Sequence, residues 1–383
     1  MDLLTAAPFM RGLALNEATT MALDGDEPVL GQIAVTASPL AEETPADAVL
    51  VDLSQTDDEA ELQEALRAAS TVGVASGVAS GTNPGKRSYA LRHDGKALLL
   101  TVTAQALPPG RLGGKMALVT GGAQGFGEEI VRGLVASGAT VFIADLNKDG
   151  ADKLASTLNA SSGRTAAYPL IMDVSNEDSV AGAFDVIART SGGLDLVVSN
   201  AGVLKAGSVL EQSLADFEFV TKVNYTAFFL VTKYAGRMMK RQHAGAPGTM
   251  TDIIQINSKS GLEGSNKNGA YAGSKFGGIG LVQSFALELV EHGIKVNAIC
   301  PGNFFDGPLW SDPDRGLFVQ YLRTGKVPGA KTVADVKAFY EAKVPMRRGC
   351  EGPDVMRAIY YLMEQQYETG QALPVTGGQV MLN

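Results

Sequence analysis

The chain has 383 residues, more than one average domain, which favours one large domain plus a smaller one. With 45% hydrophobic and 19% charged residues, its composition is typical of a protein that buries a full core. The formal net charge of −9, without a Lys/Arg cluster, argues against nucleic acid as a partner, because a duplex-binding face must be basic.

The first 110 residues are predicted to form a small α+β accessory module without a chemical motif of its own. Strands are expected over residues 29–36, 48–53, 88–91 and 97–102, and a helix over residues 57–69, whose first turn is acidic as the helix dipole favours. The last two strands flank Asp94-Gly95, a good hairpin-turn signal. The stretch Pro108-Pro109-Gly110 has the composition of a domain boundary.

From residue 111 to residue 383, short β-branched runs alternate with longer helical patterns. This alternation predicts an α/β domain with a Rossmann-like, doubly wound, parallel seven-stranded sheet. The expected strands cover residues 115–120, 140–145, 166–173, 194–200, 252–258, 295–299 and 372–376, and the expected helices residues 127–137, 180–190, 216–240, 270–292 and 354–365. Residues 303–345, rich in aromatics with a helical pattern over 333–342, are predicted to form a substrate lid, with plain packing as the alternative.

A glycine-rich turn, TGGAQGFG at residues 120–127, follows the first strand of this domain and opens a helix. Glycine is needed there because a side chain would clash with a pyrophosphate, which the helix N-terminus attracts. The next strand ends in Asp145, whose carboxylate can accept hydrogen bonds from ribose hydroxyls and would repel a 2′-phosphate. Because Leu146 and the turn supply no cation, the sequence predicts NAD(H) rather than NADP(H); alternatively, Asp145 only caps the turn.

Tyr271 and Lys275 stand at i and i+4, and therefore on one helix face. A tyrosine must ionise to accept a proton from an alcohol, and a nearby ammonium lowers its pKa by stabilising the phenolate. Ser258 ends a predicted strand, so its hydroxyl can donate to a substrate oxygen beside Tyr271. Asn224 is a polar residue inside a predicted helix, where a kink or surface role is the alternative reading.

These motifs, with Asn200-Ala201-Gly202 and Pro301-Gly302, together resemble the short-chain dehydrogenase/reductase family. The resemblance implies an oxidoreductase that transfers a hydride between NAD(H) and a secondary alcohol or ketone, and it suggests a homotetramer. By resemblance, Tyr271 is the acid/base, Ser258 polarises the substrate oxygen, Lys275 binds the nicotinamide ribose, and Asn224 holds a proton-relaying water. The cofactor would contact Gly121, Gln124, Gly125, Phe126, Gly127, Asp145, Leu146, Asp173, Val174, Asn200, Ala201, Gly202, Tyr271, Lys275, Pro301, Gly302 and Phe304.

Further motifs in the C-terminal half, at residues 255–261, 275–278, 343–350 and 375–380, are similar to family members that oxidise a hexitol phosphate to a ketose phosphate. This similarity implies a sugar alcohol phosphate as substrate, and Lys259 and Lys267 are the candidate phosphate ligands unless they are solvated surface lysines. Asp306 stands where the family often has a threonine beside the cofactor, so the loop is expected to take its own path. The alternatives are an unphosphorylated polyol or other secondary alcohol, and a non-catalytic NAD(H)-binding regulator.

Two cysteines and three histidines are scattered without ligand spacing, so we expect neither a metal site nor a disulfide framework. The first residues lack a signal-peptide pattern, and no apolar run reaches the length of a bilayer span. The sequence therefore predicts a cytoplasmic protein that has no membrane partner.

Overall fold

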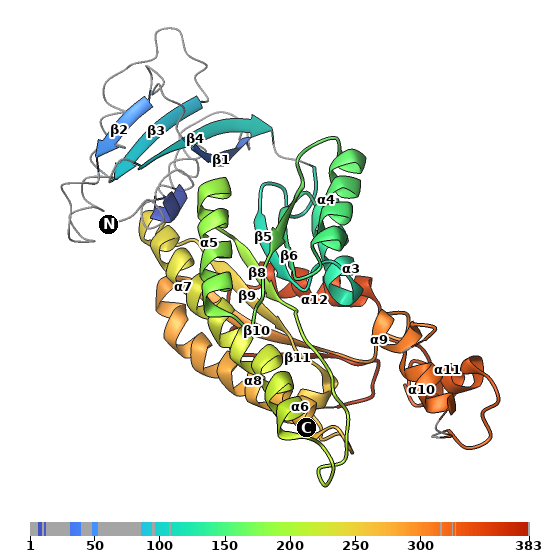
Figure 1. Cartoon of the computed structure of the whole chain (residues 1–383). Helices are drawn as coiled ribbons and strands as arrows, with labels where there is room; N and C mark the ends of the chain where they lie inside the picture. The colour runs from blue at the N-terminus through green and yellow to red at the C-terminus, as the bar shows by residue number, and fades with distance from the viewer. Residues whose placement is uncertain are drawn as a thin grey trace.

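The computed structural model describes residues 7–9, 11–12, 31–39, 48–52, 86–93, 96–106, 109–314, 316–323, 325 and 327–381. Two separate sheets are visible in Figure 1, a small one near the beginning of the chain and a larger one that follows it.

The larger sheet has seven parallel strands in the order β11-β10-β9-β8-β5-β6-β7. The chain runs outward from β5 in one direction and then, from β8, in the other, so the strand order reverses between β5 and β8. In open α/β sheets, ligands bind at such a switch point, outside the carboxyl ends of the strands. The sheet confirms the predicted fold class, with strands β5 (Met116–Thr120), β6 (Thr140–Asp145), β7 (Ala167–Ile171), β8 (Leu196–Ser199), β9 (Thr251–Ile256), β10 (Ile294–Pro301) and β11 (Ala372–Val375).

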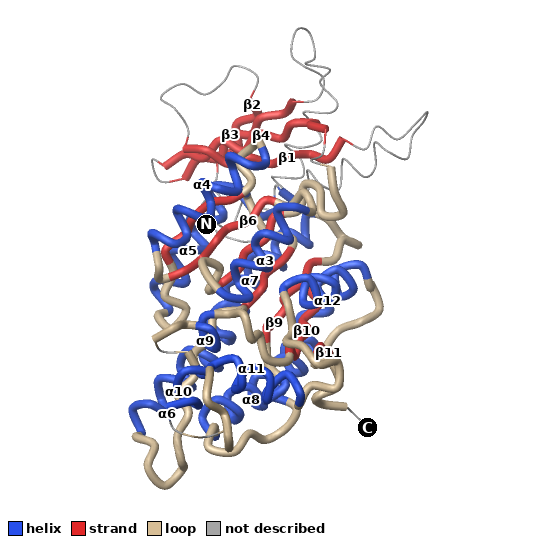
Figure 2. The backbone as a smooth tube through the Cα atoms, turned by 90° about the vertical axis from the view of Figure 1, so that its right-hand side faces the viewer, coloured by secondary structure: helices blue, strands red, loops and turns tan. Residues whose placement is uncertain are grey.

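Helices cover both faces of this sheet, as Figures 1 and 2 show. One face carries α3 (Gly125–Ala136), α4 (Lys148–Ser162) and α12 (Gly352–Glu364), and the other α5 (Glu177–Ser191), α7 (Ala227–Gly245) and α8 (Gly269–Leu289). Each helix layer encloses its own apolar cluster against the strands. Because the sheet is sandwiched, β9 and β10 are buried along their whole length.

Two helical regions differ from the sequence prediction. Helix α4 was not among the expected helices; Asn147 caps it and it buries one stripe, at Ala151, Leu154, Ala155 and Leu158. The single helix expected over residues 216–240 is divided into α6 (Leu214–Thr221), a π-helical turn (Lys222–Thr226) and α7. The amide of Asn224, inside the π-helical turn, exchanges hydrogen bonds with the backbone of Val203 instead of facing solvent.

The segment 303–345 forms a helical lobe between β10 and α12, which projects beside the main body in Figure 1. It contains α9 (Pro308–Ser311), α10 (Leu317–Arg323) and α11 (Val333–Ala342), the last with the bounds expected from the sequence. The lobe has an apolar cluster of its own, which comprises Phe305, Trp310, Leu317, Phe318, Val327, Val336 and Val344. The lobe is thus a small packed unit that joins the sheet at its two ends.

The small sheet has the order β1-β4-β3-β2, and its strands are β1 (Gly31–Pro39), β2 (Ala48–Asp52), β3 (Lys86–His93) and β4 (Lys96–Ala106). Strands β3 and β4 pair in antiparallel fashion up to His93 and Lys96, as expected for the predicted hairpin. The helix predicted over residues 57–69 lies outside the described residues. Within the described part of the chain, no helix is long and apolar enough to cross a membrane.

A short segment near the start of the chain is buried against the larger domain. Arg11, which is 2% exposed, donates to Asp195 Oδ2 at 2.8 Å and to the carbonyl of Ser191 at 3.3 Å. A Cβ on Gly12 would lie 1.9 Å from the carbonyl oxygen of Gln242, so only glycine fits this approach. The contact ties Arg11 and Gly12 to the amino-terminal edge of the larger sheet, the edge opposite the carboxyl ends.

Candidate active site

The side chains of Ser258 and Tyr271 meet at the carboxyl edge of the sheet. Ser258 follows β9 and Tyr271 lies in the first turns of α8, and the Ser258 hydroxyl lies close enough to the phenol to affect its pKa. Burial raises the pKa of the Tyr271 phenol above its ordinary value, whereas the neighbouring Ser258 hydroxyl acts to lower it. The Ser258 hydroxyl also accepts from the backbone N–H of Ser260 at 3.1 Å, which orients it.

Lys275 lies one turn after Tyr271 and is buried, with 4% exposure. Its Nζ is 5.6 Å from the centroid of the Tyr271 ring and donates to the carbonyl of Ile256 at 3.0 Å. Burial lowers the pKa of Lys275 to about 8, so most of it is still an ammonium at neutral pH. A cation at this position favours the phenolate form of Tyr271.

Asn224 reaches the same region from the π-helical turn. Its Oδ1 accepts from Val203 N at 2.8 Å, and its Nδ2 donates to Val203 O at 2.9 Å and to Ser274 Oγ at 3.2 Å. A Cβ placed on Gly202 would lie 3.4 Å from Asn224 Oδ1 and 3.7 Å from Lys275 Nζ. The structure therefore brings together four segments that are separate in the sequence and that carry Gly202, Asn224, Ser258, and Tyr271 with Lys275.

The glycine-rich turn connects β5 to α3 and has the shape of an anion cradle. Gly121 and Gly125 have left-handed φ angles of +62° and +59°, and a Cβ on Gly127 would lie 1.9 Å from the carbonyl oxygen of Gly121. Gln124 occupies the N-cap position of α3 but its side chain makes no capping hydrogen bond. The first-turn N–H groups thus suit a diphosphate, which is the fit expected for a dinucleotide.

Asn200 and Ala201, after β8, hold this turn in place. Asn200 Nδ2 donates to the carbonyls of Thr120 and Gly121, at 3.0 and 3.1 Å. The backbone N–H groups of Asn200 and Ala201 both donate to Thr120 Oγ1, at 3.0 and 3.1 Å. Thr120 is a positioning residue that the sequence analysis missed, although it starts the glycine motif.

The adenosine side of the expected cofactor site is formed by the ends of β6 and β7. Asp145 accepts from the backbone N–H groups of Ala123 and Asn147, at 3.0 and 2.9 Å, so it braces the turn and keeps lone pairs for further donors. Leu146 beside it is 69% exposed. Asp173 accepts from Ser175, and Val174 belongs to the core.

On the nicotinamide side, Pro301 ends β10 and Gly302 follows it, with Gly302 N donating to Val375 O at 2.9 Å. Phe304 then stacks on Phe126 of the glycine turn. Asp306 turns its carboxylate to Lys337 of α11 at 2.8 Å and is 68% exposed, so the loop takes its own path there.

Cys300 is a neighbour of the site that the sequence analysis did not include. It is fully buried before Pro301, and burial raises its pKa to about 11 although the nearby Lys275 ammonium acts to lower it. Its position at the end of a strand, directly before the Pro-Gly turn, is the signal that could have found it.

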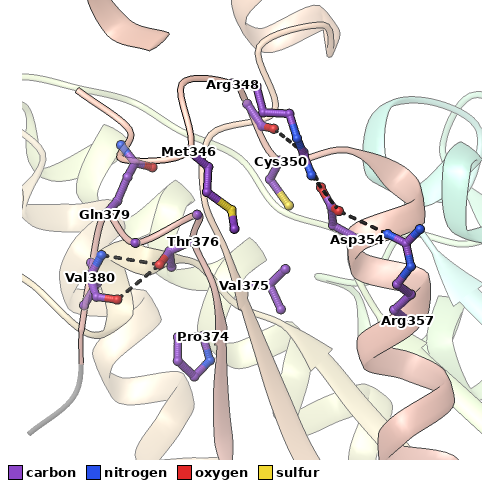
Figure 3. Close-up of a pocket in the computed structure, with 13 residues that line it drawn as sticks. Met346, Arg348, Cys350, Asp354, Arg357, Pro374, Val375, Thr376, Gln379 and Val380 are labelled. Carbon is purple, nitrogen blue, oxygen red and sulfur yellow. Dashed lines mark hydrogen bonds and ion pairs between the residues drawn. The ribbon is translucent and has the colours of Figure 1, made fainter. Parts of the chain in front are cut away.

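A cavity of about 410 Å³ lies beside Gly302, between residues 346–350, the start of α12 and residues 374–380 (Figure 3). Arg348 and Arg357 line it, but both pair with Asp354, and Glu351 lies 3.8 Å from Arg348. Two cations thus face two carboxylates, so this cavity offers an anion no excess positive charge. In the described part of the chain, no group of three His, Cys, Asp or Glu side chains is placed to hold a metal ion.

The fold, the switch-point crevice and the Ser/Tyr/Lys arrangement define an oxidoreductase of the nicotinamide-dependent class. Residues 115–309 match the family described as short chain dehydrogenase, and the chain belongs to this family. The sequence prediction of the family is confirmed.

The chain is also similar to individual members of this family. The chain is 37% identical, over 270 residues, to the sorbitol-6-phosphate 2-dehydrogenase of Escherichia coli; the match covers 70% of this chain and 99% of that protein. The crystal structure of the sorbitol-6-phosphate 2-dehydrogenase of Erwinia amylovora is 38% identical, with a TM-score of 0.64, and covers 70% of this chain and 100% of its own. An actinorhodin polyketide ketoreductase solved with NADPH is 28% identical, with a TM-score of 0.61, over 69% of this chain and 97% of its own.

Proposed function

We propose that the chain is an NAD(H)-dependent dehydrogenase of a sugar alcohol phosphate, of the type that converts sorbitol 6-phosphate to fructose 6-phosphate. The observation that carries the proposal is the placement of the Ser258 hydroxyl and the Lys275 ammonium beside the Tyr271 phenol at the carboxyl edge of the sheet. The likeness to sorbitol-6-phosphate 2-dehydrogenases supports the choice of substrate class.

In the proposed oxidation, the Ser258 hydroxyl and the Tyr271 phenolate hold the substrate oxygen, and Tyr271 takes the hydroxyl proton. Bound NAD supplies the hydride acceptor. The Lys275 ammonium stabilises the phenolate during this step. Because Asn224 contacts the Val203 backbone and Ser274, its side chain is held rigidly beside Lys275, where it can fix a water that passes the proton outward. In the reverse reaction, the Tyr271 phenol donates its proton to the ketone oxygen.

The proposed preference for NAD rests on Asp145, which ends β6 with no cation at Leu146. Replacing the carboxylate, in Asp145→Ala, should weaken the binding of NAD more than that of NADP. The ribose of NAD loses a hydrogen-bond acceptor, whereas the 2′-phosphate of NADP is no longer repelled. The ratio of the kcat/KM value with NAD to that with NADP should therefore fall. Asp145→Asn is the informative partner, since its amide still accepts the hydrogen bond from Ala123 but carries no charge. A wild-type enzyme that already prefers NADP would contradict this assignment.

The substrate's phosphate is proposed to be received by Lys259, which begins a short 3₁₀ turn (Lys259–Gly261) directly after Ser258 and is half-buried. Lys267 is exposed, with a φ of +55°, and is the second candidate. The balanced charges of the cavity at Arg348 favour Lys259 over that cavity.

The decisive experiment compares sorbitol, other polyols and their 6-phosphates with NAD, using wild type and Lys259→Met. We expect turnover with the phosphate ester and a marked loss without the phosphate. In Lys259→Met, the KM for the phosphate ester should rise while kcat changes little, since this side chain binds a remote group. Equal activity on the free polyol would favour the dehydrogenase of an unphosphorylated polyol, and no turnover on any alcohol would favour a non-catalytic NAD(H)-binding regulator.

The chain is also proposed to act as a homotetramer in the cytoplasm. A groove of about 270 Å³ between α7 and α8 offers a surface on which a second copy can pack. It is lined by apolar Phe229, Phe285 and Leu289 together with charged Lys233, Arg237, Lys240 and Glu288. Phe229 is 44% exposed, which supports this use.

A further inference from the structure

Two aromatic rings join the glycine-rich turn to the base of the helical lobe. Phe126, in the first turn of α3, stacks on Phe304 with a centroid distance of 4.3 Å and an interplanar angle of 14°. A second contact lies next to it, because a Cβ on Gly125 would be 3.9 Å from Pro308 Cδ at the start of α9. The turn after Phe304 is tight: Gly307 N donates to Phe304 O at 3.1 Å, and a Cβ on Gly307 would lie 2.5 Å from the ring.

The position of this stack in the sheet is what makes it informative. Phe126 follows β5 and Phe304 follows β10, and these strands are separated by β8 and β9. The stack therefore bridges three strand spacings, about 14 Å, along the carboxyl edge. Asn200, after β8, and Ser258, after β9, lie between the two strands that carry the rings. Phe126 belongs to the diphosphate cradle, and Phe304 follows the Pro301–Gly302 turn.

The lobe behind Phe304 has an apolar core of its own. Phe305 packs edge-on against Trp310 at 5.0 Å, and both belong to the lobe's own apolar cluster, which is separate from the two clusters of the sheet. At its base, the lobe is held by the hydrogen bond from Cys350 N to Asn303 O at 2.9 Å and by the Phe126–Phe304 stack.

We propose that the Phe126–Phe304 stack is a gate for the dinucleotide: it must open for the cofactor to enter and to leave, and it closes again once the cofactor lies in the site. The proposal rests on the dinucleotide binding of the proposed function and adds the step that sets the rate of cofactor exchange. Both rings belong to positions expected to contact the cofactor, and the gate arises because they also contact each other.

A gate predicts different binding kinetics from those of a residue that only contacts the bound cofactor. If the stack is closed before NADH binds, its removal lowers the barrier to entry, so the association of NADH should accelerate. Because both rings are also expected cofactor contacts, dissociation should accelerate as well, and the association rate is the quantity that identifies a gate. An aromatic pair of this geometry corresponds to roughly a two- to tenfold change in rate. A ring that only contacts the bound cofactor would instead speed dissociation alone and weaken affinity.

The test is stopped-flow binding and displacement of NADH, followed by energy transfer from Trp310, the single tryptophan of the chain, to the bound NADH. The variants are Phe304→Ala, which removes the ring, and Phe304→Leu, which removes the ring but keeps an apolar side chain to support the packing of the lobe. Unchanged Trp310 emission without NADH shows that the lobe's cluster is intact. The matched control is Phe339→Ala on α11, which removes a ring that contacts Tyr340 at 5.5 Å within the lobe.

We expect faster association of NADH in both Phe304 variants, wild-type rates in Phe339→Ala, and no further gain in the association rate when Phe126→Leu is added to Phe304→Leu. An unchanged association rate, with or without faster dissociation, would overturn the gate. Failure of the wild type to bind NADH would overturn the proposed function itself, so the two failures are distinguishable.

Discussion

Replacing Tyr271 with phenylalanine should lower turnover by about 10²–10⁴-fold, because the variant has no group to exchange the substrate proton. NADH affinity should be largely kept, since the substitution retains the aromatic ring beside Lys275 and removes only one hydroxyl. Steady-state assays in both directions, together with NADH titration, separate the two effects.

The matched control is Tyr234→Phe, which removes a phenol that hydrogen-bonds to exposed Glu177 at 3.2 Å on the far side of α7. It should keep wild-type turnover. If Tyr271→Phe retained activity within about tenfold of wild type, the acid/base would have to be another group.

The second large effect concerns the stability of the fold. Arg11 and Asp195 form an ion pair at 2.8 Å in which the side chains are 3% and 8% exposed. Without Arg11, the buried Asp195 carboxylate keeps Lys115 at 3.8 Å and the N–H of Met116 but loses its closest cation. Breaking a buried ion pair in this way costs up to about 3–5 kcal/mol. We therefore expect Arg11→Met to lower the free energy of unfolding by that order, measured by urea denaturation. Adding Asp195→Asn should restore part of the loss, because the stranded charge is gone.

This effect should depend on pH. Burial acts to raise the pKa of Asp195, but Arg11, Lys115 and the backbone N–H of Met116 lower it on balance below its ordinary value. A lowered carboxyl pKa stabilises the fold above the carboxyl range and loses that effect on acidification through the folded-state pKa. The gap between wild type and Arg11→Met should therefore shrink in acid.

Arg132→Met provides the comparison, because Arg132 forms an ion pair with Glu128 on the surface of α3, with side chains 44% and 33% exposed. It should cost at most about 0.5 kcal/mol. Equal losses in the two arginine variants would show that Arg11 contributes no more than a surface charge. A fragment that starts near Gly110 lacks Arg11, so its free energy of unfolding should fall as in Arg11→Met. The substitution Asp195→Asn should restore part of this loss in the fragment as well.

Local patterns predicted much of the larger domain. Strands β9 and β10 each carry several β-branched residues, and α11 has the bounds that its periodicity predicts. By contrast, nothing in the sequence around Asn224 distinguishes a π-helical turn from a regular helix. That turn depends on the hydrogen bonds to Val203, a residue that only the tertiary fold places there.

The same limit applies to the contacts made over long distances along the chain. Arg11 carried no recognisable motif, and its partner lies 184 residues away. Phe126 and Phe304 each belonged to an expected cofactor set, but their stacking depends on the path of the loop after Gly302. Side-chain chemistry could be assigned from sequence, whereas the pairing of distant side chains could not.

The contacts of Arg11 and Gly12 with the larger domain also have a consequence for folding during synthesis. This segment contacts Ser191, Asp195 and Gln242, so it emerges from the ribosome long before its binding surface has been made. Until β8 and α7 have been synthesised and have folded, Phe9 and Arg11 have no groove to enter. Contacts of such high sequence separation form late and slowly. We therefore expect the ion pair between Arg11 and Asp195 to form late in folding, after β8 is in place.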